Sequence, residues 1–448
     1  MNKKLIALLS VLSLSLSLPL IPATAAVKAG GACSSVGAVS VSGGVKYVCA
    51  KSGKKLIWSK IKQTPDPLLT NAEEYADIRE CLLESKIESQ NLDVNIDPFA
   101  PKANGELNVG IVFVSFLDAP GDPKVFKFWK DVQQKNAESY FKTSSYGRLN
   151  LSFTRVEKIY PINRASTFYN LNYDPHSNKF DPRANPQGVY QDAVELAKTD
   201  YDFSKIDLIH VVFPDSALIG INGANGIRLK VGDKIFYKGL MAPMDVSKTN
   251  KVQPGDTGIL HNKWLVHELG HILGLIHPYD TFNLTQRSKR EYSVVAWSVM
   301  GYDDAIGTDL LAWEKFILGW IDSTQVNCIP TNSSESYTMF LEAIGVNSDK
   351  KKMAVIPLTL TTAIVVESRR ISPIDKLKSS EEGVLVYKLD VTKKSNEAAV
   401  EVVFKKSKSR LQELVGTLSQ GEFVSIDGFK ISVSKHSATG DFVTIRKG

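Results

Sequence analysis

The chain has 448 residues, four cysteines and a formal net charge of +6 from 54 basic and 48 acidic side chains. A chain of this length exceeds what one ordinary hydrophobic core serves, so we expect two or three domains. The charge is spread along the sequence without a basic block, which gives weak support for binding to anionic surfaces and none for nucleic-acid recognition.

The N-terminus has the composition of a secretory signal peptide. Lys3 and Lys4 precede an apolar run over residues 5–21, and a small-residue A-x-A cleavage site ends at Ala25. An uncleaved membrane anchor is the alternative, but the run is short for a spanning helix and contains several serines. We therefore expect residues 1–25 to be a cleaved signal peptide and the mature protein to be secreted, without stable membrane insertion.

Residues 26–62 are predicted to form a small disulfide-bridged β module with glycine-rich turns and an alternating strand pattern. Cys33 and Cys49 are close in this hairpin-like segment, so we expect a Cys33–Cys49 bridge, which leaves Cys81–Cys328 as the second. A spacer or surface-attachment role without chemistry is expected for so small a unit.

Residues 63–105 begin with a Pro-containing linker and continue with a helix-like stretch at about Asn71–Glu88. We interpret the segment as a linker, and a removable propeptide is the alternative interpretation.

Residues 106–325 are predicted to form an α/β domain. A nearly continuous apolar run at Leu107–Leu117 is typical of a strand covered on both faces. Strands and helices then alternate, which indicates an α/β sheet. The predicted elements are a helix at Lys124–Thr143, a strand at Leu149–Val156, a helix at Gln187–Lys198, a strand at Ile206–Phe213, a Gly/Asn-rich loop at Gly220–Gly226 and a strand near Lys234–Met241.

Residues 326–448 have a β-rich pattern, in which short strand-like runs are separated by turn signals such as Asp427-Gly428. We expect a C-terminal all-β, sandwich-like domain.

The segment WLVHELGHILGLIHPYD at 264–280 contains the candidate metal ligands and the candidate catalytic base. His267 and His271 are four residues apart, so on a helix both imidazoles project from one face and reach one Zn²⁺. Glu268 follows the first histidine, where its carboxylate can act on a zinc-bound water as general base without binding the metal.

Gly274 is predicted to end this helix, because a residue without Cβ can adopt a positive φ and turn the chain sharply. The turn would return His277 to the metal as the third ligand and leave the fourth position to water. Asp280, three residues further on, is the competing third ligand.

A second signal lies at Ser298-Val299-Met300-Gly301-Tyr302. Together with the extended histidine motif, a methionine in a tight turn under the metal is the metzincin pattern. Met300 would support the histidines without binding metal. Tyr302 would bind zinc at rest or donate a hydrogen bond to the oxyanion, with a structural tyrosine as the alternative.

At these residues the sequence resembles the secreted, metzincin-type zinc metalloproteases related to immune inhibitor A. The similar segments over residues 107–448 include HELGHILGLIHPYD, WSVMGYDD and LLAWEKFILGWI. The resemblance implies a metzincin-like catalytic domain with a twisted mixed sheet and an active-site helix. Relatives commonly carry Asp where this chain has His277. They often hold structural Ca²⁺, for which Asp280, Asp303 and Asp304 are candidates, although no recognisable calcium loop is present.

The sequence therefore predicts a secreted zinc-dependent endopeptidase acting on protein or peptide substrates. A non-catalytic zinc-containing binding or adhesion protein is the main alternative, and a peptidase restricted to short peptides is another. In a zymogen, Cys81 would cap the zinc as a thiolate instead of forming a disulfide, but no cysteine-switch sequence surrounds it.

Overall fold

The computed structural model falls into two units, Met1–Leu68 and Leu69–Gly448. Within them the structure describes residues 28–34, 39–42, 45–53, 55–60, 69–70, 74–86, 91–95, 97–171, 173–174, 179–221, 223–246, 263–280, 297–301, 309–403 and 416–448. The predicted signal peptide lies outside these residues. In the described part of the chain, no helix has the length and apolar character that crossing a membrane requires.

The smaller unit is a three-stranded antiparallel sheet of β1 (Val39–Ser42), β2 (Val45–Ser52) and β3 (Lys55–Lys60). A disulfide joins Cys33 to Cys49, and Cys49 is buried. The predicted pairing is confirmed. The bridge supports a unit too small for a large core.

The larger unit begins with a five-stranded sheet in the order β5-β4-β8-β10-β9. Strands β5, β4, β8 and β10 run parallel, and the edge strand β9 is antiparallel to β10. The mixed α/β character predicted from the sequence is confirmed. The strand bounds are β4 Gly105–Ser115, β5 Leu149–Pro161, β8 Leu208–Phe213, β9 Gly223–Val231 and β10 Lys234–Pro243.

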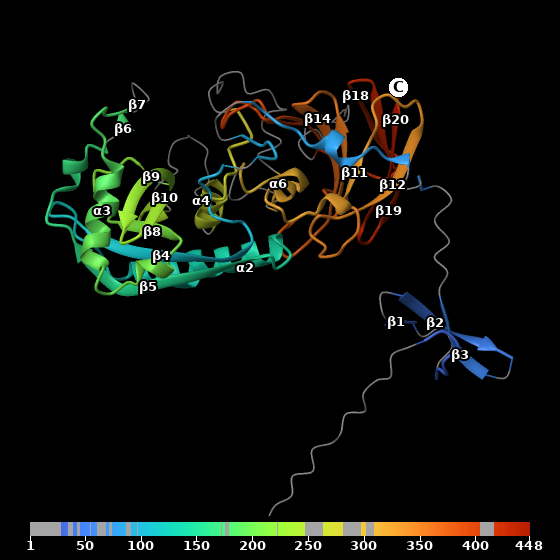
Figure 1. Ribbon diagram of the computed structural model, residues 1–448, viewed down its shortest axis with the longest axis horizontal. Helices are drawn as coiled ribbons and strands as arrows, with labels where there is room; N and C mark the ends of the chain where they lie inside the picture. Colours follow the sequence, from blue (N-terminus) through green and yellow to red (C-terminus); the bar gives the residue numbers. More distant parts are fainter. Residues whose placement is uncertain are drawn as a thin grey trace, which may run out of the picture. The chain divides into compact units, whose positions relative to one another are not determined.

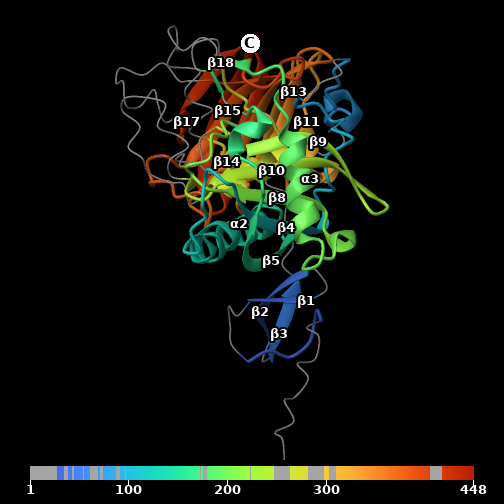
Figure 2. The ribbon, with the colours of Figure 1, turned by 90° about the vertical axis from the view of Figure 1, so that its left-hand side faces the viewer.

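Helices cover both faces of this sheet, as the continuous apolar run of β4 predicts. Alternate residues of β4 enter two separate cores: Phe113 packs in the cluster that contains Leu269, and Val114 packs in the cluster that contains Val189. Figure 2 shows α2 and α3 on either side of β4 and β8. The helices are α1 Val125–Phe128, a π-helical segment Trp129–Gln134, α2 Lys135–Ser144, α3 Pro186–Ala197, α4 Trp264–Ile272 and α6 Ala312–Ile317. Single 3₁₀ turns lie at Ile78–Cys81, Ser166–Tyr169, Phe203–Lys205 and Ser323–Gln325, and a two-stranded ribbon pairs β6 Tyr173–Asp174 with β7 Lys179–Phe180.

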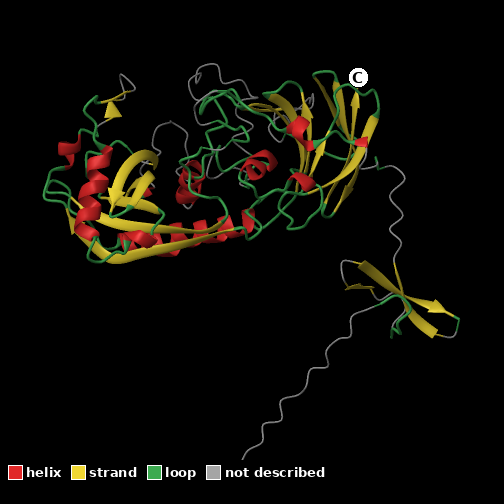
Figure 3. Ribbon diagram, viewed as in Figure 1, coloured by secondary structure: helices red, strands yellow, loops and turns green. Residues whose placement is uncertain are grey.

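The C-terminal region is β-rich, as predicted, and Figure 3 shows strands predominating there. One sheet has the order β11-β13-β14-β15-β16, with β17 paired to β15, and the other has the order β12-β20-β19-β18. Ile364 of the first sheet and Ile445 of the second lie in one buried cluster. The strands are β11 Val326–Cys328, β12 Ser336–Glu342, β13 Met353–Pro357, β14 Thr362–Arg369, β15 Gly383–Asp390, β16 Val400–Val402, β17 Thr417–Leu418, β18 Phe423–Ile426, β19 Phe429–Ser437 and β20 Gly440–Lys447.

The other face of the first C-terminal sheet shares a hydrophobic core with the five-stranded sheet. Val365 of β14 and Tyr387 of β15 belong to the same buried cluster as Leu269 of α4 and Phe113 of β4. Figure 1 shows α4 and α6 in the region between the two sheet systems. This shared cluster therefore joins the two sheet systems, beside the separate clusters that contain Val189 and Ile364.

The predicted helix-like stretch at Asn71–Glu88 is wrong for the residues that the structure describes there. Residues 74–86 contain no α-helix; Glu74 is in 3₁₀ conformation and Ile78–Cys81 forms a 3₁₀ turn. The amides of Ala76 and Glu84 donate to the carbonyls of Cys328 and Leu360, so long-range partners take hydrogen bonds that a helix would make internally. The predicted Cys81–Cys328 disulfide is confirmed and ties this segment to the C-terminal strands.

The predicted loop at Gly220–Gly226 is also partly wrong, because β9 begins at Gly223. Gly223, Ala224 and Asn225 pair with β10 in antiparallel register. Strand pairing therefore overrides the weak β propensity of glycine and asparagine.

Candidate metal centre

Helix α4 ends where the sequence predicted. Gly274 has φ +103°, the left-handed region that favours glycine. The amide of Leu275 donates to the Gly270 carbonyl at 3.0 Å, and the amide of Gly274 donates to the His271 carbonyl at 3.1 Å. These bonds satisfy carbonyls at the helix end and turn the chain back across it.

The turn brings His277 to the two helix histidines. The Nε2 atoms of His267, His271 and His277 lie 3.1 Å from one another in each of the three pairs. Among the residues that the structure describes, these three form the group of histidine, cysteine and acidic side chains that could hold a metal ion. The rings are partly buried.

The hydrogen bonds of the Nδ1 atoms determine how the Nε2 atoms face the point between the three histidines. The Nδ1 of His267 lies 2.7 Å from the Val299 carbonyl, and that of His271 lies 2.8 Å from the Leu275 carbonyl. A carbonyl can only accept, so each Nδ1 carries the proton and donates it. The Nε2 lone pairs of both rings are then directed at the centre.

The cluster fits a cation and not a set of mutual hydrogen bonds. Burial lowers the pKa of His271 to about 3, and burial together with the neighbouring histidines lowers the pKa of His277 well below its usual value. Neutral rings with Nδ1 protonated have no hydrogen to place between Nε2 atoms that are 3.1 Å apart. A metal ion bound by the three lone pairs would remove this repulsion.

Glu268 is held by the start of β9. Its Oε2 accepts a hydrogen bond from the Ala224 amide at 2.9 Å. A Cβ atom on Gly223 would lie 2.5 Å from that same oxygen, so only glycine leaves room for the carboxylate. Burial raises the pKa of Glu268 to about 7, and the Ala224 amide acts in the opposite direction.

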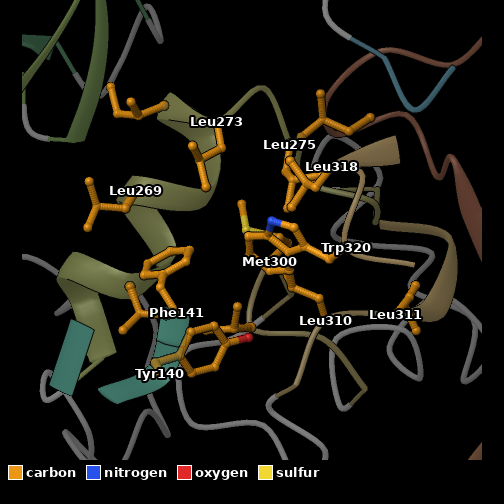
Figure 4. Packing of buried hydrophobic residues seen from close by; sticks show 14 of the residues in the cluster. Tyr140, Phe141, Leu269, Leu273, Leu275, Met300, Leu310, Leu311, Leu318 and Trp320 are labelled. Carbon is orange, nitrogen blue, oxygen red and sulfur yellow. The ribbon is translucent and has the colours of Figure 1, made fainter. Parts of the chain in front are cut away.

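Met300 lies beneath α4, fully buried, and Figure 4 shows it among Leu275, Leu310 and Trp320. Its amide donates to Ser298 Oγ at 3.1 Å, and that hydroxyl donates to Glu314 Oε2 at 2.7 Å. The preceding residue, Val299, supplies the carbonyl that orients His267. The methionine turn, residues 298–301, therefore contacts the site through the Val299 carbonyl, and its Met300 side chain packs against α4.

The remaining predicted residues do not join the cluster. The backbone of Asp280 forms an isolated β-bridge with Glu397, and its carboxylate is not part of the histidine group. Tyr302, Asp303 and Asp304 lie outside the described residues.

Sequence reasoning missed four contributors: Gly223, Ala224, Gly270 and Ser395. A Cβ atom on Gly270 would overlap the sulfur of Met300, and a glycine inside a helix is a signal that could have indicated such a close approach. Ser395 Oγ lies 3.3 Å from the Nδ1 of His277, and no sequence signal indicates it.

No protein-family model matches the chain, and a search of curated proteins finds no relative of it.

Proposed function

We propose that this chain is a secreted zinc-dependent endopeptidase of the metzincin type, similar to the metalloproteases related to immune inhibitor A. One observation carries the proposal. Three imidazoles with converging Nε2 atoms share a helix and its turn with Glu268, a carboxylate fixed by a main-chain amide and raised in pKa to about 7. This combination would supply a metal site and a base from one helix and its turn.

The nitrogen spacing suits zinc. Three ligand nitrogens about 2.0–2.1 Å from a tetrahedral Zn²⁺ lie roughly 3.3–3.4 Å from one another. The observed separations of 3.1 Å are close to this value. Three neutral imidazoles also leave the full charge of the ion unneutralised, which favours its action as a Lewis acid, and three protein ligands leave a position open.

Bound Zn²⁺ would act as a Lewis acid, lowering the pKa of a coordinated water towards 7 and polarising the scissile carbonyl. Glu268 then accepts a proton from the attacking water and delivers it to the leaving amine nitrogen. The Ala224 amide holds Oε2, which directs proton transfer to Oε1 and fixes the rotamer of the carboxylate. A base with a pKa near the working pH is suited to both transfers.

Secretion is part of the proposal and is supported by two features. The first 25 residues have the pattern of a signal peptide. The two disulfides, Cys33–Cys49 and Cys81–Cys328, are compatible with an oxidising, extracellular location.

Metal analysis combined with casein digestion tests the proposal. The purified protein should hold one zinc per chain, cleave casein, lose activity in excess chelator and regain it with added zinc. Glu268→Ala should keep the zinc and lose cleavage by at least ~10²-fold. A zinc-loaded wild-type protein that cleaves neither casein nor short peptides would instead be the non-catalytic binding protein, and cleavage of short peptides alone would indicate a restricted peptidase.

A further inference from the structure

The three histidines differ in what holds their outer ring nitrogens. His267 donates to the main-chain carbonyl of Val299, which immediately precedes Met300. His271 donates to the main-chain carbonyl of Leu275, which lies just after the helix. The Nδ1 of His277 instead faces the hydroxyl of Ser395, at 3.3 Å. That serine lies 118 residues away, in the loop that follows β15 of the C-terminal β-rich region.

The Ser395 hydroxyl receives two groups of the same histidine. The main-chain amide of His277 donates to Ser395 Oγ at 3.1 Å, and the ring Nδ1 lies 3.3 Å from the same oxygen. A serine oxygen has two lone pairs and can accept both bonds. If Nε2 of His277 faces the cluster as a lone pair, Nδ1 carries the proton and donates it to Ser395. The hydroxyl therefore fixes both the backbone position and the ring orientation of His277.

Main-chain hydrogen bonds from the residues that follow Ser395 extend this contact. The Asn396 amide donates to the His277 carbonyl at 3.0 Å, and the Val400 amide donates to the Pro278 carbonyl at 3.0 Å. Glu397 also forms an antiparallel β-bridge with Asp280. Residues 395–400 thus run against residues 277–280.

Two residues of this loop other than glycine have a left-handed backbone conformation. Asn396 has φ +70° and Ala398 has φ +57°, a left-handed conformation that alanine rarely adopts because its Cβ comes too close to the following carbonyl oxygen. Glu397 stabilises the turn, because its carboxylate accepts from the Lys394 amide at 2.9 Å. Strained backbone beside a functional side chain is typical of positioning segments.

From these contacts we propose that Ser395 is a positioning residue for the metal centre, and that the C-terminal β-rich region thereby contributes directly to metal affinity. Hydrogen-bond partners of metal-binding histidines orient the ring and typically change metal affinity about 10–100-fold when removed. The proposal rests on the metal site of the proposed function, and it does not depend on peptidase activity.

The test measures Co²⁺ binding to the metal-free full-length chain by titration and by visible absorption. Ser395→Ala should weaken Co²⁺ binding about 10–100-fold and change the absorption spectrum, because the geometry of one nitrogen ligand changes. Ser395→Thr keeps the hydroxyl and should restore most of the affinity. Thr392→Ala is the matched control: its hydroxyl lies in the same loop but donates to Asp390 at 2.6 Å, so Co²⁺ affinity should stay within about twofold of wild type.

The His277→Ala background separates positioning from general damage to the fold. Without the imidazole that it orients, Ser395→Ala should cause no further loss of Co²⁺ affinity. An equal loss in both backgrounds, or wild-type affinity in Ser395→Ala, would overturn the inference. Tight Co²⁺ binding that Ser395→Ala weakens, in a wild-type protein that cleaves no peptide, would support this inference while removing the proposed function. A wild-type chain that binds no Co²⁺ would remove both.

Discussion

The sulfur of Met300 occupies the place that a side chain on Gly270 would need. A Cβ atom built on Gly270 would overlap the Met300 Sδ and lie 3.1 Å from its Cε. Gly270 immediately precedes His271, and Met300 is fully buried. The helix that carries two histidines of the candidate metal centre therefore packs on the Met300 side chain at a residue that has no side chain of its own.

Gly270→Ala should destabilise the metal-free protein. Overpacking a fully formed core costs about 1–3 kcal/mol, which exceeds the gain of at most about 1 kcal/mol in helix propensity. The measurement is the free energy of unfolding by denaturant. In a Met300→Ala background the space is open, so Gly270→Ala should become neutral or stabilising. The same loss in both backgrounds would show that the contact is unimportant.

Gly223→Ala should displace the Glu268 carboxylate. The added Cβ would lie 2.5 Å from Oε2 and 2.9 Å from Cδ, and Gly223 has φ +96°, which strains any other residue. We expect cleavage of casein to fall at least ~10²-fold while the zinc content stays at one per chain.

Gly226→Ala is the matched control on the same strand, because a Cβ atom there meets nothing within 4 Å. It should retain activity within a few-fold of wild type. Equal losses in the two variants would mean that β9 tolerates no substitution, and that the proximity of Gly223 to Glu268 has no special role.

His210 should make the fold sensitive to acid. It is buried in β8, its ring centroid lies 4.8 Å from that of Trp129, and neither ring nitrogen has a hydrogen-bond partner among the described residues. Burial lowers its pKa from 6.5 to about 3. Between these values the unfolded chain binds a proton that the folded chain does not, so the free energy of unfolding falls as pH drops below 6.5.

At pH 5 this difference amounts to about 2 kcal/mol relative to neutral pH. In His210→Phe, the decrease in the free energy of unfolding between pH 7.5 and pH 5 should be smaller than in wild type by roughly this amount. Comparing the two pH values within each protein removes any packing effect of the substitution. An unchanged decrease would show that His210 does not titrate in this range.

Removing the Cys81–Cys328 disulfide should strongly destabilise the larger unit. The bridge closes a sequence separation of 247 residues, for which loop entropy gives a contribution of about 5–6 kcal/mol. Replacing both cysteines with alanine should lower the melting temperature of the larger unit. Replacing Cys33 and Cys49, which belong to the smaller unit, should leave that transition unchanged. Equal melting temperatures in all three proteins would contradict this account.

The parts of the site that the sequence predicted are those set by local rules. The spacing of His267 and His271 on one helix face and the glycine stop at Gly274 both depend on neighbours within a few residues, and both are present in the structure. The parts that it missed come from distant segments. Ser395 reaches His277 from 118 residues away, and a serine in a polar loop carries no pattern that indicates a partner.

The same distinction explains the errors in the fold. The start of β9 is rich in glycine and asparagine, so local propensity predicted a loop, whereas pairing with β10 makes it a strand. The stretch from Ala76 to Glu84 has a helix-like composition, but the amides at its two ends bond to distant carbonyls, and a disulfide joins Cys81 to Cys328. In both segments, contacts with distant parts of the chain determine the secondary structure.

A cleavage-site profile of a folded protein substrate, measured by mass spectrometry at equal zinc content, tests the central claim most directly. Zinc-loaded wild type should produce internal cleavages, and zinc-loaded Glu268→Ala should produce at least ~10²-fold fewer at the same sites. Cleavage that persists at the same sites and rate in Glu268→Ala would contradict the assignment of Glu268 as the base and of this centre as the active site.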